Sequence, residues 1–491
     1  MRHENILKMA KIIGRKEEIA LLQSIEASDR SAFVAVYGRR RVGKTFLIRS
    51  LYDGKFTFQL TGIANVETDN QLTNFHSSLV RYFPEFEDNL PAKDWFQAFQ
   101  QLITAIESLP QTGKKVLFLD ELPWLDTLNA QFIPALEHFW NSWASARTDI
   151  VLIVCGSAAS WIINQLINNT GGLYNRVTHP IQLEPFTLAE CEAFFKAKSP
   201  GFDRYQMLQL YMVFGGIPFY LDFIDPRKSA TQNINDLCFT PKGRLRNEFQ
   251  KLYASLFKKA DKHIAIIEAL AQKAMGLERD VLLKTAKLTN GGSTTTILRE
   301  LEESNFIRKY NTFGKSKNNA IYQLTDFYSL FFLKFIKNNS PFDDDFWING
   351  IDTPEIRAWS GYAFEQVCLL HLPLIKKALG ISSVQTQTTA WVGSDGTDKT
   401  QIDLVIDRRD QVINLCEIKF SIKPFTIEKE YADNLRKKMG IFKDATKTQK
   451  ALWLTFITTN GLTQNTYAQS LVHQSVTMDA LFVSNTEGYI Y

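Results

Sequence analysis

Eight residues near the N-terminus, GRRRVGKT from Gly38 to Thr45, carry the types and spacing that bind phosphate. They match GxxxxGK[ST] in full, between the apolar run FVAVY and the helix-like TFLIRSLY. Glycines let the backbone amides turn around phosphate oxygens, Lys44 reaches the β- and γ-phosphates, and the Thr45 hydroxyl is a Mg²⁺ ligand. A chance match in a basic loop is the alternative. The predicted ATP-binding residues here are Gly38, Arg39, Arg40, Arg41, Val42, Gly43, Lys44, Thr45 and Phe46.

Two acidic residues end a second apolar run. KVLFL, residues 115–119, is followed directly by Asp120 and Glu121. An aspartate at a strand end can hold the water shell of Mg²⁺, and a neighbouring glutamate can polarise the attacking water as a general base. We therefore predict Asp120 as a metal-holding residue and Glu121 as catalytic. An acidic strand end that caps the following helix is the alternative.

Two later polar residues are placed to act on the same phosphates. Ser157 ends the apolar run IVLIVCG, where a polar side chain can sense the γ-phosphate. A helix cap is the alternative interpretation. Arg176 follows two glycines in GGLYNR, and we predict an arginine finger that acts within this chain or on a neighbouring subunit. An ordinary surface arginine is the alternative.

A third candidate site lies in IDLVIDRRDQVINLCEIKF, residues 402–420, which reads as two strands joined by a polar turn. If Asp407 pairs with Ile413, antiparallel counting places Asp403 opposite Glu417. Two facing carboxylates repel each other unless a cation lies between them, and such oxygens suit Mg²⁺ or Mn²⁺. Lys419 would share their face and stabilise charge on a phosphate.

Strict alternation along these strands gives further expectations. It predicts one face for Ile402, Leu404 and Ile406, and the opposite face for Asp403, Val405 and Asp407. Cys416, Ile418 and Phe420 would face the core. The alternative to a metal site is an exposed charged face, where ion pairs contribute only ~0–1 kcal/mol.

The region 257–340 predicts three short helices followed by two strands, which is the winged-helix pattern. Its third helix would begin with Ser293 as N-cap. DNA-reading residues would be Thr294, Thr295, Thr296 and Arg299 on that helix, and Lys315 and Lys317 on the wing. The alternative is a scaffold that packs on the ATPase. Arg436, Lys437 and Lys438 form a further basic cluster, which either guides a phosphate backbone or is a solvated helix face.

The composition limits the class of protein to which the chain can belong. The chain has 491 residues with a net charge of +4, which permits nucleic-acid binding without arguing for it. Its five cysteines are scattered without a CxxC pair, as in a reduced cytoplasm. No apolar run reaches the ~18 residues of a membrane span. We therefore expect a cytoplasmic protein with no membrane partner.

The first half resembles a known family. IIGRKEEIALL, the loop YGRRRVGKT, LFLDELPWL, CGSAASWI, GLYNR and GGIPFYL together resemble the archaeal-type ATPases within the AAA+-related, signal-transducing (STAND) P-loop NTPases. The resemblance implies that Gly14 and Arg15 contact adenine. It also implies that Gly216 and Pro218 lie in a helical lid and report the nucleotide state.

The second half carries a weaker resemblance. YQLTDFYSLFFLKFI and WSGYAFEQVCLLH resemble the C-terminal region that accompanies this ATPase, which is thought to be of the PD-(D/E)XK restriction-endonuclease-like class. Thirteen residues separate Asp403 from Glu417, which fits the D…ExK pattern. The sequence departs from it in one respect, because Asp403 follows Gln401 and Ile402 rather than proline. The resemblance also implies that Glu365, on the helix-like stretch before these strands, is the acidic residue that this class places there and a third metal ligand.

These signals predict an α/β protein. Its parts would be a P-loop NTPase αβα sandwich at 1–180, a helical lid at 181–256, a winged helix at 257–340 and a nuclease-like α/β domain at 350–491. The stretch 337–356 is rich in turn residues and acids, which predicts a linker.

The predicted function is Mg²⁺-dependent ATP hydrolysis that controls metal-dependent cleavage of DNA. The alternative is a nucleotide-dependent signalling switch, in which the C-terminal domain is an inactive interaction module. A transcriptional regulator that uses the winged helix is a third and weaker candidate. The sequence leaves open whether a second copy of the chain or a partner protein takes part.

Overall fold

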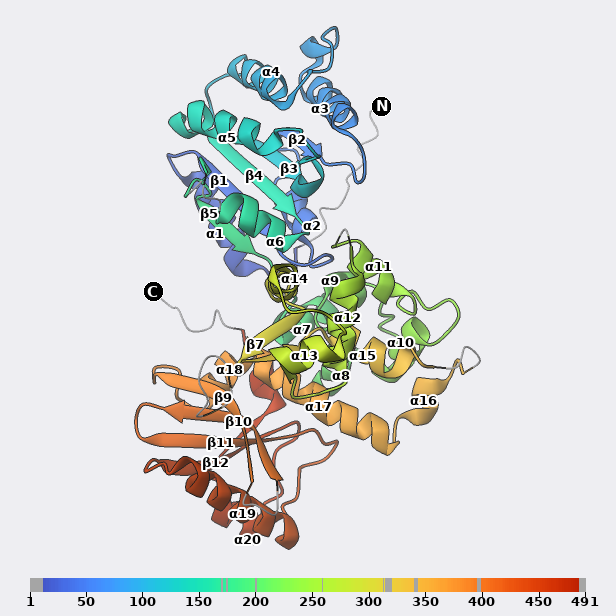
Figure 1. Cartoon of the computed structure of the whole chain (residues 1–491), viewed down its shortest axis with the longest axis vertical. Coiled ribbons are helices and arrows are strands. Elements are labelled where there is room, and N and C mark those ends of the chain that lie inside the picture. The colour runs from blue at the N-terminus through green and yellow to red at the C-terminus, as the bar shows by residue number, and fades with distance from the viewer. Residues whose placement is uncertain are drawn as a thin grey trace. The chain divides into compact units, whose positions relative to one another are not determined.

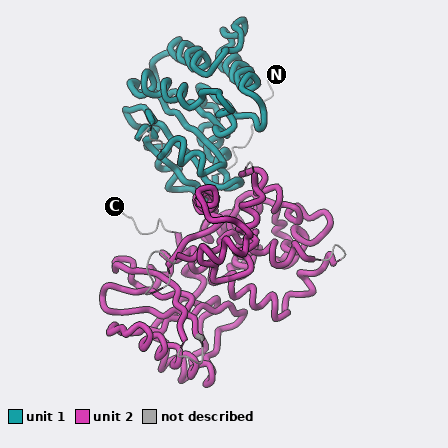
Figure 2. Tube along the Cα trace, in the orientation of Figure 1, with its two compact units in different colours: residues 1–184 teal, residues 185–491 magenta. Residues whose placement is uncertain are grey.

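The computed structural model forms two compact units, residues 1–184 and 185–491 (Figures 1 and 2). The division falls close to the predicted boundary after residue 180, and the three regions predicted beyond that boundary share one unit. The residues that the structure describes are 12–168, 171–173, 175–198, 201–257, 259–311, 313, 320–339, 343–394 and 399–484.

The first unit is built on a parallel sheet of five strands in the order β2-β3-β4-β1-β5. Every residue of β3 and β4 is buried, because helices cover both faces of the sheet. The predicted parallel sheet is therefore confirmed. The strands are β1 (Ala32–Tyr37), β2 (Phe56–Thr61), β3 (Lys115–Asp120), β4 (Ile150–Gly156) and β5 (His179–Gln182).

Aromatic and aliphatic side chains form the core of this unit. Phe75, Trp95, Phe99 and Phe132 pack edge to face or tilted against one another above the sheet. Burial of these aromatic side chains holds together the three helices that carry them. The helices are α1 (Lys16–Ala27), α2 (Lys44–Leu51), α3 (Thr68–Tyr82), α4 (Trp95–Glu107), α5 (Phe132–Ser142) and α6 (Ala159–Ile162).

The second unit begins with a group of helices that are buried against its other parts. Tyr205 of α8 stacks on Phe420, and Arg204 forms an ion pair with Asp479 at 2.8 Å. The predicted lid region therefore packs on the C-terminal region. The helices are α7 (Leu188–Lys198), α8 (Arg204–Phe214), α9 (Pro218–Leu221), α10 (Ala230–Cys238) and α11 (Glu248–Ala254).

Residues 259–324 alternate helices with a small sheet of order β6-β8-β7. The third helix begins at Gly292, with Gly291 in the N-cap position and no side-chain cap, so the prediction of Ser293 as N-cap was wrong. The elements are α12 (Asp261–Ala271), β6 (Leu277–Glu278), α13 (Arg279–Thr285), α14 (Gly292–Glu303), β7 (Ile307–Tyr310) and β8 (Ile321–Leu324).

The predicted linker is partly a packed element, which corrects the expectation from its turn-rich composition. Its helix α16 (Phe346–Gly350) buries Trp347 against Phe331, Phe335 and Trp359. Those aromatic contacts join α15 (Phe327–Phe331) to α17 (Pro354–Leu370). Two tryptophans in one cluster outweigh the polar residues around them, because each aromatic side chain buries a large apolar area.

The C-terminal sheet is mixed, with the order β13-β12-β11-β10-β9. The strands from β9 to β11 are antiparallel, whereas β11, β12 and β13 are parallel. Helix α17 packs on β11, and α19 (Lys429–Thr446) packs on β9 and β10. The remaining elements are α18 (Leu372–Ala378), β9 (Thr386–Ser394), β10 (Lys399–Arg408), β11 (Val412–Lys419), β12 (Ala451–Thr458), α20 (Thr466–Leu471) and β13 (Gln474–Thr477).

The register of the hairpin β10–β11 is as predicted, because Asp407 pairs with Ile413. The strict alternation of side chains is not, since the pairing of β10 with β9 shifts between Ile402 and Val405. Ile402 and Val405 consequently join the same apolar cluster with Trp391 and Phe442, although period-two counting placed them on opposite faces. A β-bulge adds one residue to a strand and so reverses the side-chain alternation beyond it.

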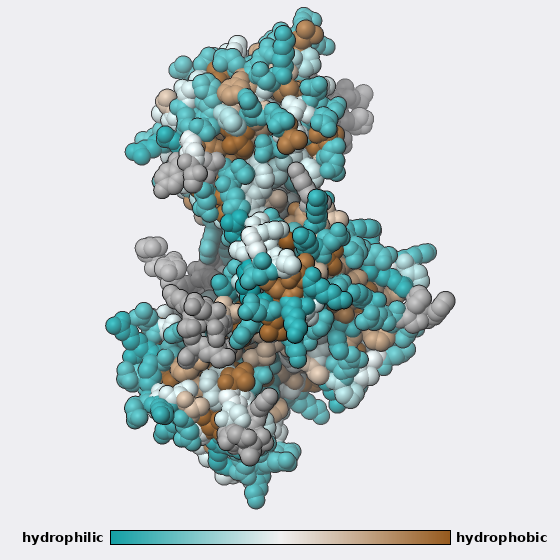
Figure 3. All heavy atoms as spheres, in the orientation of Figure 1, coloured by the Kyte–Doolittle hydropathy of each residue, from teal (hydrophilic) through white to brown (hydrophobic). Residues whose placement is uncertain are grey.

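Among the described residues, no helix combines the length and apolar character needed to cross a membrane. On the face shown in Figure 3, hydrophilic residues predominate and hydrophobic residues are scattered between them.

His371 links the helical region to the C-terminal region of the second unit and makes its stability depend on pH. Its Nε2 accepts the backbone N–H of Leu188 at 3.1 Å, so Nδ1 carries the proton and donates to the carbonyl of Val367. Burial lowers the pKa of His371 to about 4. The unfolded chain therefore takes up a proton at higher pH than the folded chain does.

We predict that this contribution to folding is complete above pH 6.5 and is lost as the pH falls towards 4. The loss reaches up to about 3 kcal/mol at the lower limit. Urea unfolding at pH 7 and pH 5 measures it, with His371→Gln as the matched neutral variant. The wild type is expected to lose more stability between the two pH values than the variant does. An equal loss would contradict the assignment.

Candidate functional site

The predicted phosphate loop connects β1 to α2, and its backbone has the conformation that glycine permits. Gly38 and Gly43 have φ values of 136° and 94°. A side chain at Gly38 would clash with the carbonyl oxygen of Leu183. Lys44 Nζ donates to the carbonyls of Gly38 and Arg39, each at 2.9 Å. The lysine thus closes the loop on itself, and burial lowers the pKa of its ammonium group.

The structure brings the two predicted magnesium-holding residues together. Thr45 Oγ1 donates to Asp120 Oδ1 at 3.1 Å. Burial, followed by the adjacent Glu121, raises the pKa of Asp120. Arg49 on α2 lies 3.6 Å from the other carboxylate oxygen of Asp120. The sequence analysis missed Arg49, and its spacing of one helical turn from Thr45 is the signal that was present.

Ser157 and Glu121 also meet. Ser157 Oγ donates to Glu121 Oε1 at 3.0 Å, while Glu121 adopts a left-handed conformation with φ of 50°. The N-cap of α6 is Ala158 and has no side-chain cap, so the alternative of Ser157 as a helix cap does not hold. Loop, acid pair and serine therefore gather at the carboxyl edge of the sheet, where α/β proteins bind ligands.

Arg15, which the resemblance implies contacts adenine, is a buried residue beside the phosphate loop. The guanidinium is 5% exposed and donates to the carbonyls of Val42 at 3.1 Å and Glu184 at 2.7 Å. Glu18 lies 3.7 Å away. The side chain ties the phosphate loop to the end of the first unit. Gly14 precedes it with φ of 70°.

Three other residues were predicted to act on the nucleotide or report its state, namely Arg176, Gly216 and Pro218. Arg176 is exposed in a turn that its own backbone N–H closes on the carbonyl of Leu173 at 3.0 Å. Gly216 belongs to the second unit, where its carbonyl accepts the N–H of Phe186 at 2.7 Å. Pro218 begins α9 in the same unit.

The acidic residues of the second site lie together in the second unit. Glu417 is only 3% exposed, so the alternative of an exposed charged face does not hold for it. Tyr431 donates to its Oε2 at 2.9 Å, Lys438 pairs with its Oε1, and Lys419 lies 3.6 Å away. Two lysines and a phenol thus balance one buried carboxylate, as a buried charge requires.

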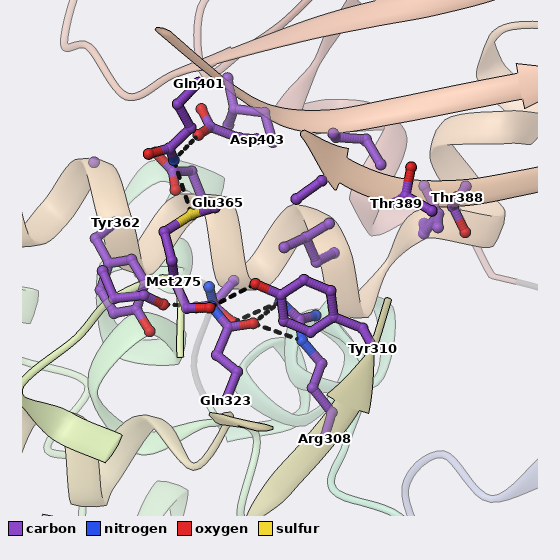
Figure 4. Close-up of a pocket in the computed structure, with 18 of the residues that line it drawn as sticks. Met275, Arg308, Tyr310, Gln323, Tyr362, Glu365, Thr388, Thr389, Gln401 and Asp403 are labelled. Atoms are coloured by element: carbon purple, nitrogen blue, oxygen red, sulfur yellow. Dashed lines mark hydrogen bonds between the residues drawn. The ribbon is translucent and has the colours of Figure 1, made fainter. Parts of the chain in front are cut away.

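Asp403 and Glu365 complete this acidic cluster (Figure 4). Gln401 donates to Asp403 Oδ1 at 2.6 Å. Burial raises the pKa of Asp403, with Glu417 adding to the effect. Burial, followed by the charge of Asp403, raises the pKa of Glu365 to about 8. The three carboxylates therefore sense one another electrostatically, which is the condition that a bound cation relieves.

The carboxylate oxygens of Glu365, Asp403 and Glu417 suit a hard divalent cation. Both oxygens of Glu417, however, already contact protein groups, namely Tyr431 and Lys438. Among the described residues, no group of three His, Cys, Asp or Glu side chains has a metal-holding arrangement. Metal binding at Glu417 would require Lys438 to move aside. Aspartate and glutamate oxygens are nevertheless the ligands that Mg²⁺ and Mn²⁺ prefer.

Lys438 and Tyr431 were not identified as site residues from the sequence. Lys438 had been grouped with Arg436 and Lys437 as a phosphate guide or a solvated face, but it points inward to Glu417. Arg436 instead pairs with Asp433 on the same helix at 2.7 Å. The helical periodicity of α19 places Tyr431, Leu435 and Lys438 on one side, and this was the available signal.

The predicted DNA-reading helix is α14. Thr294 is buried and donates to the carbonyl of Thr289 at 2.8 Å, so its prediction as a base-reading residue was wrong. Thr295, Thr296 and Arg299 are exposed, and Thr295 accepts a hydrogen bond from Arg279 at 2.7 Å. Lys315 and Lys317 lie outside the described residues.

We predict that Arg15→Met lowers the unfolding free energy of the nucleotide-free protein by about 2–3 kcal/mol, because two buried carbonyls lose a charged donor. ATP binding should weaken as well, since the loop loses its tether at Val42. Thermal unfolding and isothermal titration measure the two effects. The control is Arg30→Met, at an exposed position of the same unit. Unchanged stability with weakened ATP binding would support an adenine contact instead.

Comparisons with known proteins agree with the geometry of the first unit. Residues 12–224 match the profile of an ATPase domain found predominantly in Archaea. A protein of Methanocaldococcus jannaschii, described as uncharacterized, is 24% identical over 443 residues, which cover 87% of this chain and 91% of the relative.

Similar solved structures include a Walker-type ATPase of Pyrococcus abyssi, with 17% identity and a TM-score of 0.48, covering 66% of this chain and 96% of that one. The ORC2 protein of Aeropyrum pernix, in ADPNP and ADP complexes, has 12% identity and a TM-score of 0.43, covering 67% and 94%. A STAND protein of Pyrococcus horikoshii has 16% identity and a TM-score of 0.30, covering 76% and 52%. Residues 12–224 are thus similar to the ATPase domains of the archaeal type.

Proposed function

We propose that this protein couples Mg²⁺-dependent ATP hydrolysis in its first unit to a metal-dependent nuclease-like site in its second unit, with DNA as the substrate. The ATPase part of the proposal rests on the hydrogen bond from Thr45 to Asp120, beside which Lys44 binds the carbonyl of Gly38 in the phosphate loop. The observation that carries the other half is the cluster of Glu365, Asp403 and Glu417.

In the first unit, each side chain has a role that follows from its position. Lys44 exchanges its two carbonyl partners for the β- and γ-phosphates, while Thr45 and Asp120 hold Mg²⁺. Glu121 orients the attacking water as general base. Ser157, bonded to Glu121, registers the presence of the γ-phosphate. Arg176 is exposed and therefore free to reach a nucleotide on a neighbouring copy.

In the second unit, the proposed site gives its residues the roles that the PD-(D/E)XK resemblance implies. Asp403 and Glu417, with Glu365, hold a Mg²⁺ or Mn²⁺ ion, which supplies an activated water and stabilises charge on the scissile phosphate. Lys419 lies beside Glu417 and helps to neutralise that phosphate. Lys438 pairs with Glu417 and would have to give up that contact for Glu417 to serve as a metal ligand.

The other proposed assignments follow from element order. Residues 181–256 form the lid, 257–340 a winged helix and 350–491 the nuclease-like domain. We assign the winged helix mainly a scaffold role, because Thr294 is buried and α14 carries Glu300, Glu302 and Glu303 besides Arg299. Gly216 and Pro218 would then transmit the nucleotide state within the lid.

A signalling switch is the second candidate function. It is favoured by the ion pair of Lys438 with Glu417 and by the lack of a ready metal arrangement among the described residues. In that case the C-terminal domain binds a partner protein, and ATP turnover alone is the output. Metal binding at Asp403 distinguishes the two functions.

We predict that Glu121→Gln lowers the ATP turnover number by about 100-fold or more, because a general base contributes that much. Lys44→Ala should abolish ATP binding. A coupled assay of phosphate release measures the turnover, and titration with a labelled ATP analogue measures binding. Wild-type turnover in Glu121→Gln would show that another group activates the water.

The nuclease half is tested on supercoiled plasmid and on linear single- and double-stranded DNA, with Mg²⁺ or Mn²⁺, with and without ATP. We predict that Asp403→Ala abolishes cleavage and that Lys44→Ala removes its dependence on ATP. Asp407→Asn is the matched control, because this acid of the same strand pairs with Lys450 at 2.6 Å, outside the cluster. ATP turnover without cleavage under any condition would favour the signalling switch.

A further inference from the structure

A pocket of about 480 Å³ adjoins the acidic cluster inside the second unit (Figure 4). One wall comes from residues 274–323, through Met275, Arg308 and Tyr310. The opposite wall comes from α17 and the strands β9 to β11. Phe313 joins the walls, because its N–H donates to the carbonyl of Ala390 at 3.0 Å and its ring packs on Phe442. The elements on the two sides of the pocket therefore contact each other directly.

Arg308 brings an uncompensated positive charge into this pocket. Its Nε donates to Gln323 Oε1 at 2.8 Å and one terminal nitrogen donates to Gln366 Oε1 at 3.1 Å, and both acceptors are neutral. Within the described part of the chain, Arg308 forms no ion pair with a carboxylate. Burial lowers the pKa of this guanidinium. A desolvated cation with neutral partners is stabilised when an anion binds next to it.

Thr389 supplies a second and independent observation on the opposite wall. Its side chain is only 8% exposed, and its Oγ1 has no hydrogen-bond partner among the described residues. The residue lines the same pocket. A buried hydroxyl without a partner costs free energy unless a ligand or water satisfies it.

The size and the remaining lining define the ligand further. The volume lies in the roughly 300–1,000 Å³ range of small-molecule sites. Tyr310 and Tyr362 offer aromatic rings, and Asp403 with Glu365 forms an acidic end. A double helix does not enter such a pocket, whereas enzymes that extrude a base receive it in one. Aromatic stacking, a cation and an unsatisfied hydroxyl together fit one base with its sugar and phosphate.

We propose that this pocket binds a single unpaired nucleotide unit, with its phosphate at Arg308 and a polar group at Thr389. The inference rests on the proposed function of the neighbouring acidic cluster, and it specifies the substrate as an unpaired or extruded nucleotide rather than intact duplex. The same chemistry comes either from the end of a DNA strand or from a free mononucleotide that acts as an effector.

The experiment is titration of full-length protein carrying Lys44→Ala, so that the phosphate loop does not contribute. The probes are dAMP, dTMP and a short 5′-phosphorylated single-stranded oligonucleotide, with Ca²⁺ as a poorly cleaving cation. Isothermal titration and ³¹P NMR give the dissociation constants. We expect saturable binding that weakens at least about tenfold in Arg308→Gln and several-fold in Thr389→Val.

Two further variants separate the pocket from general effects. Gly361 lines the pocket and has nothing within 4 Å of an added Cβ, so Gly361→Leu fills the pocket without a clash and should abolish binding. Lys309→Gln removes a charge from the neighbouring, exposed position of β7 and should leave binding unchanged. Melting temperatures identify any variant that fails to fold.

Absence of saturable binding, or equal affinity in Arg308→Gln, Thr389→Val and Gly361→Leu, would overturn the proposal. Binding of the mononucleotides but not of the oligonucleotide identifies a free effector, and the reverse identifies a strand end; both support the pocket. Cleavage by wild type without nucleotide binding removes this inference alone. Nucleotide binding without any cleavage that depends on Asp403 removes the nuclease proposal and leaves the pocket standing.

Discussion

The hydrogen bond between Thr45 and Asp120 joins residues 75 positions apart, and it depends on the parallel pairing of β1, β4 and β3. Parallel strands end at one edge, so the phosphate loop after β1 meets the acids after β3. The same edge receives Ser157 after β4. Arg15 then fixes the loop from behind through Val42. A change in strand order would separate these groups even if every motif were kept.

Desolvation determines the electrostatics of the acidic cluster in the second unit. Glu417 is buried, and its charge is balanced by Lys438, Lys419 and the hydroxyl of Tyr431. Burial raises the pKa of the neighbouring Glu365 and Asp403, and the charge of Lys419 opposes that rise at both. Glu417 is thus bonded to protein groups on both carboxylate oxygens, whereas burial predisposes Glu365 and Asp403 to take up a proton or a cation.

Specific side-chain and backbone contacts connect the parts of the second unit. His371 binds the start of α7, Trp347 anchors α16 among aromatic rings, and Phe313 attaches the small sheet region to β9. These contacts make the helical, small-sheet and C-terminal regions one packed unit. A displacement at any of them would alter the wall of the pocket beside Asp403, because Arg308 and Tyr310 lie on that wall.

The sequence by itself determined the local chemistry: the phosphate loop, the acid pair at residues 120–121, the parallel sheet and the register of Asp407 with Ile413. These depend on neighbouring residues and short periodicities. Tertiary structure alone decided the bulge at Ile402–Val405, the inward direction of Lys438 and the tether from Arg15 to Val42. Each depends on which distant surface desolvates a side chain, and a buried charge turns to the partner that folding brings to it.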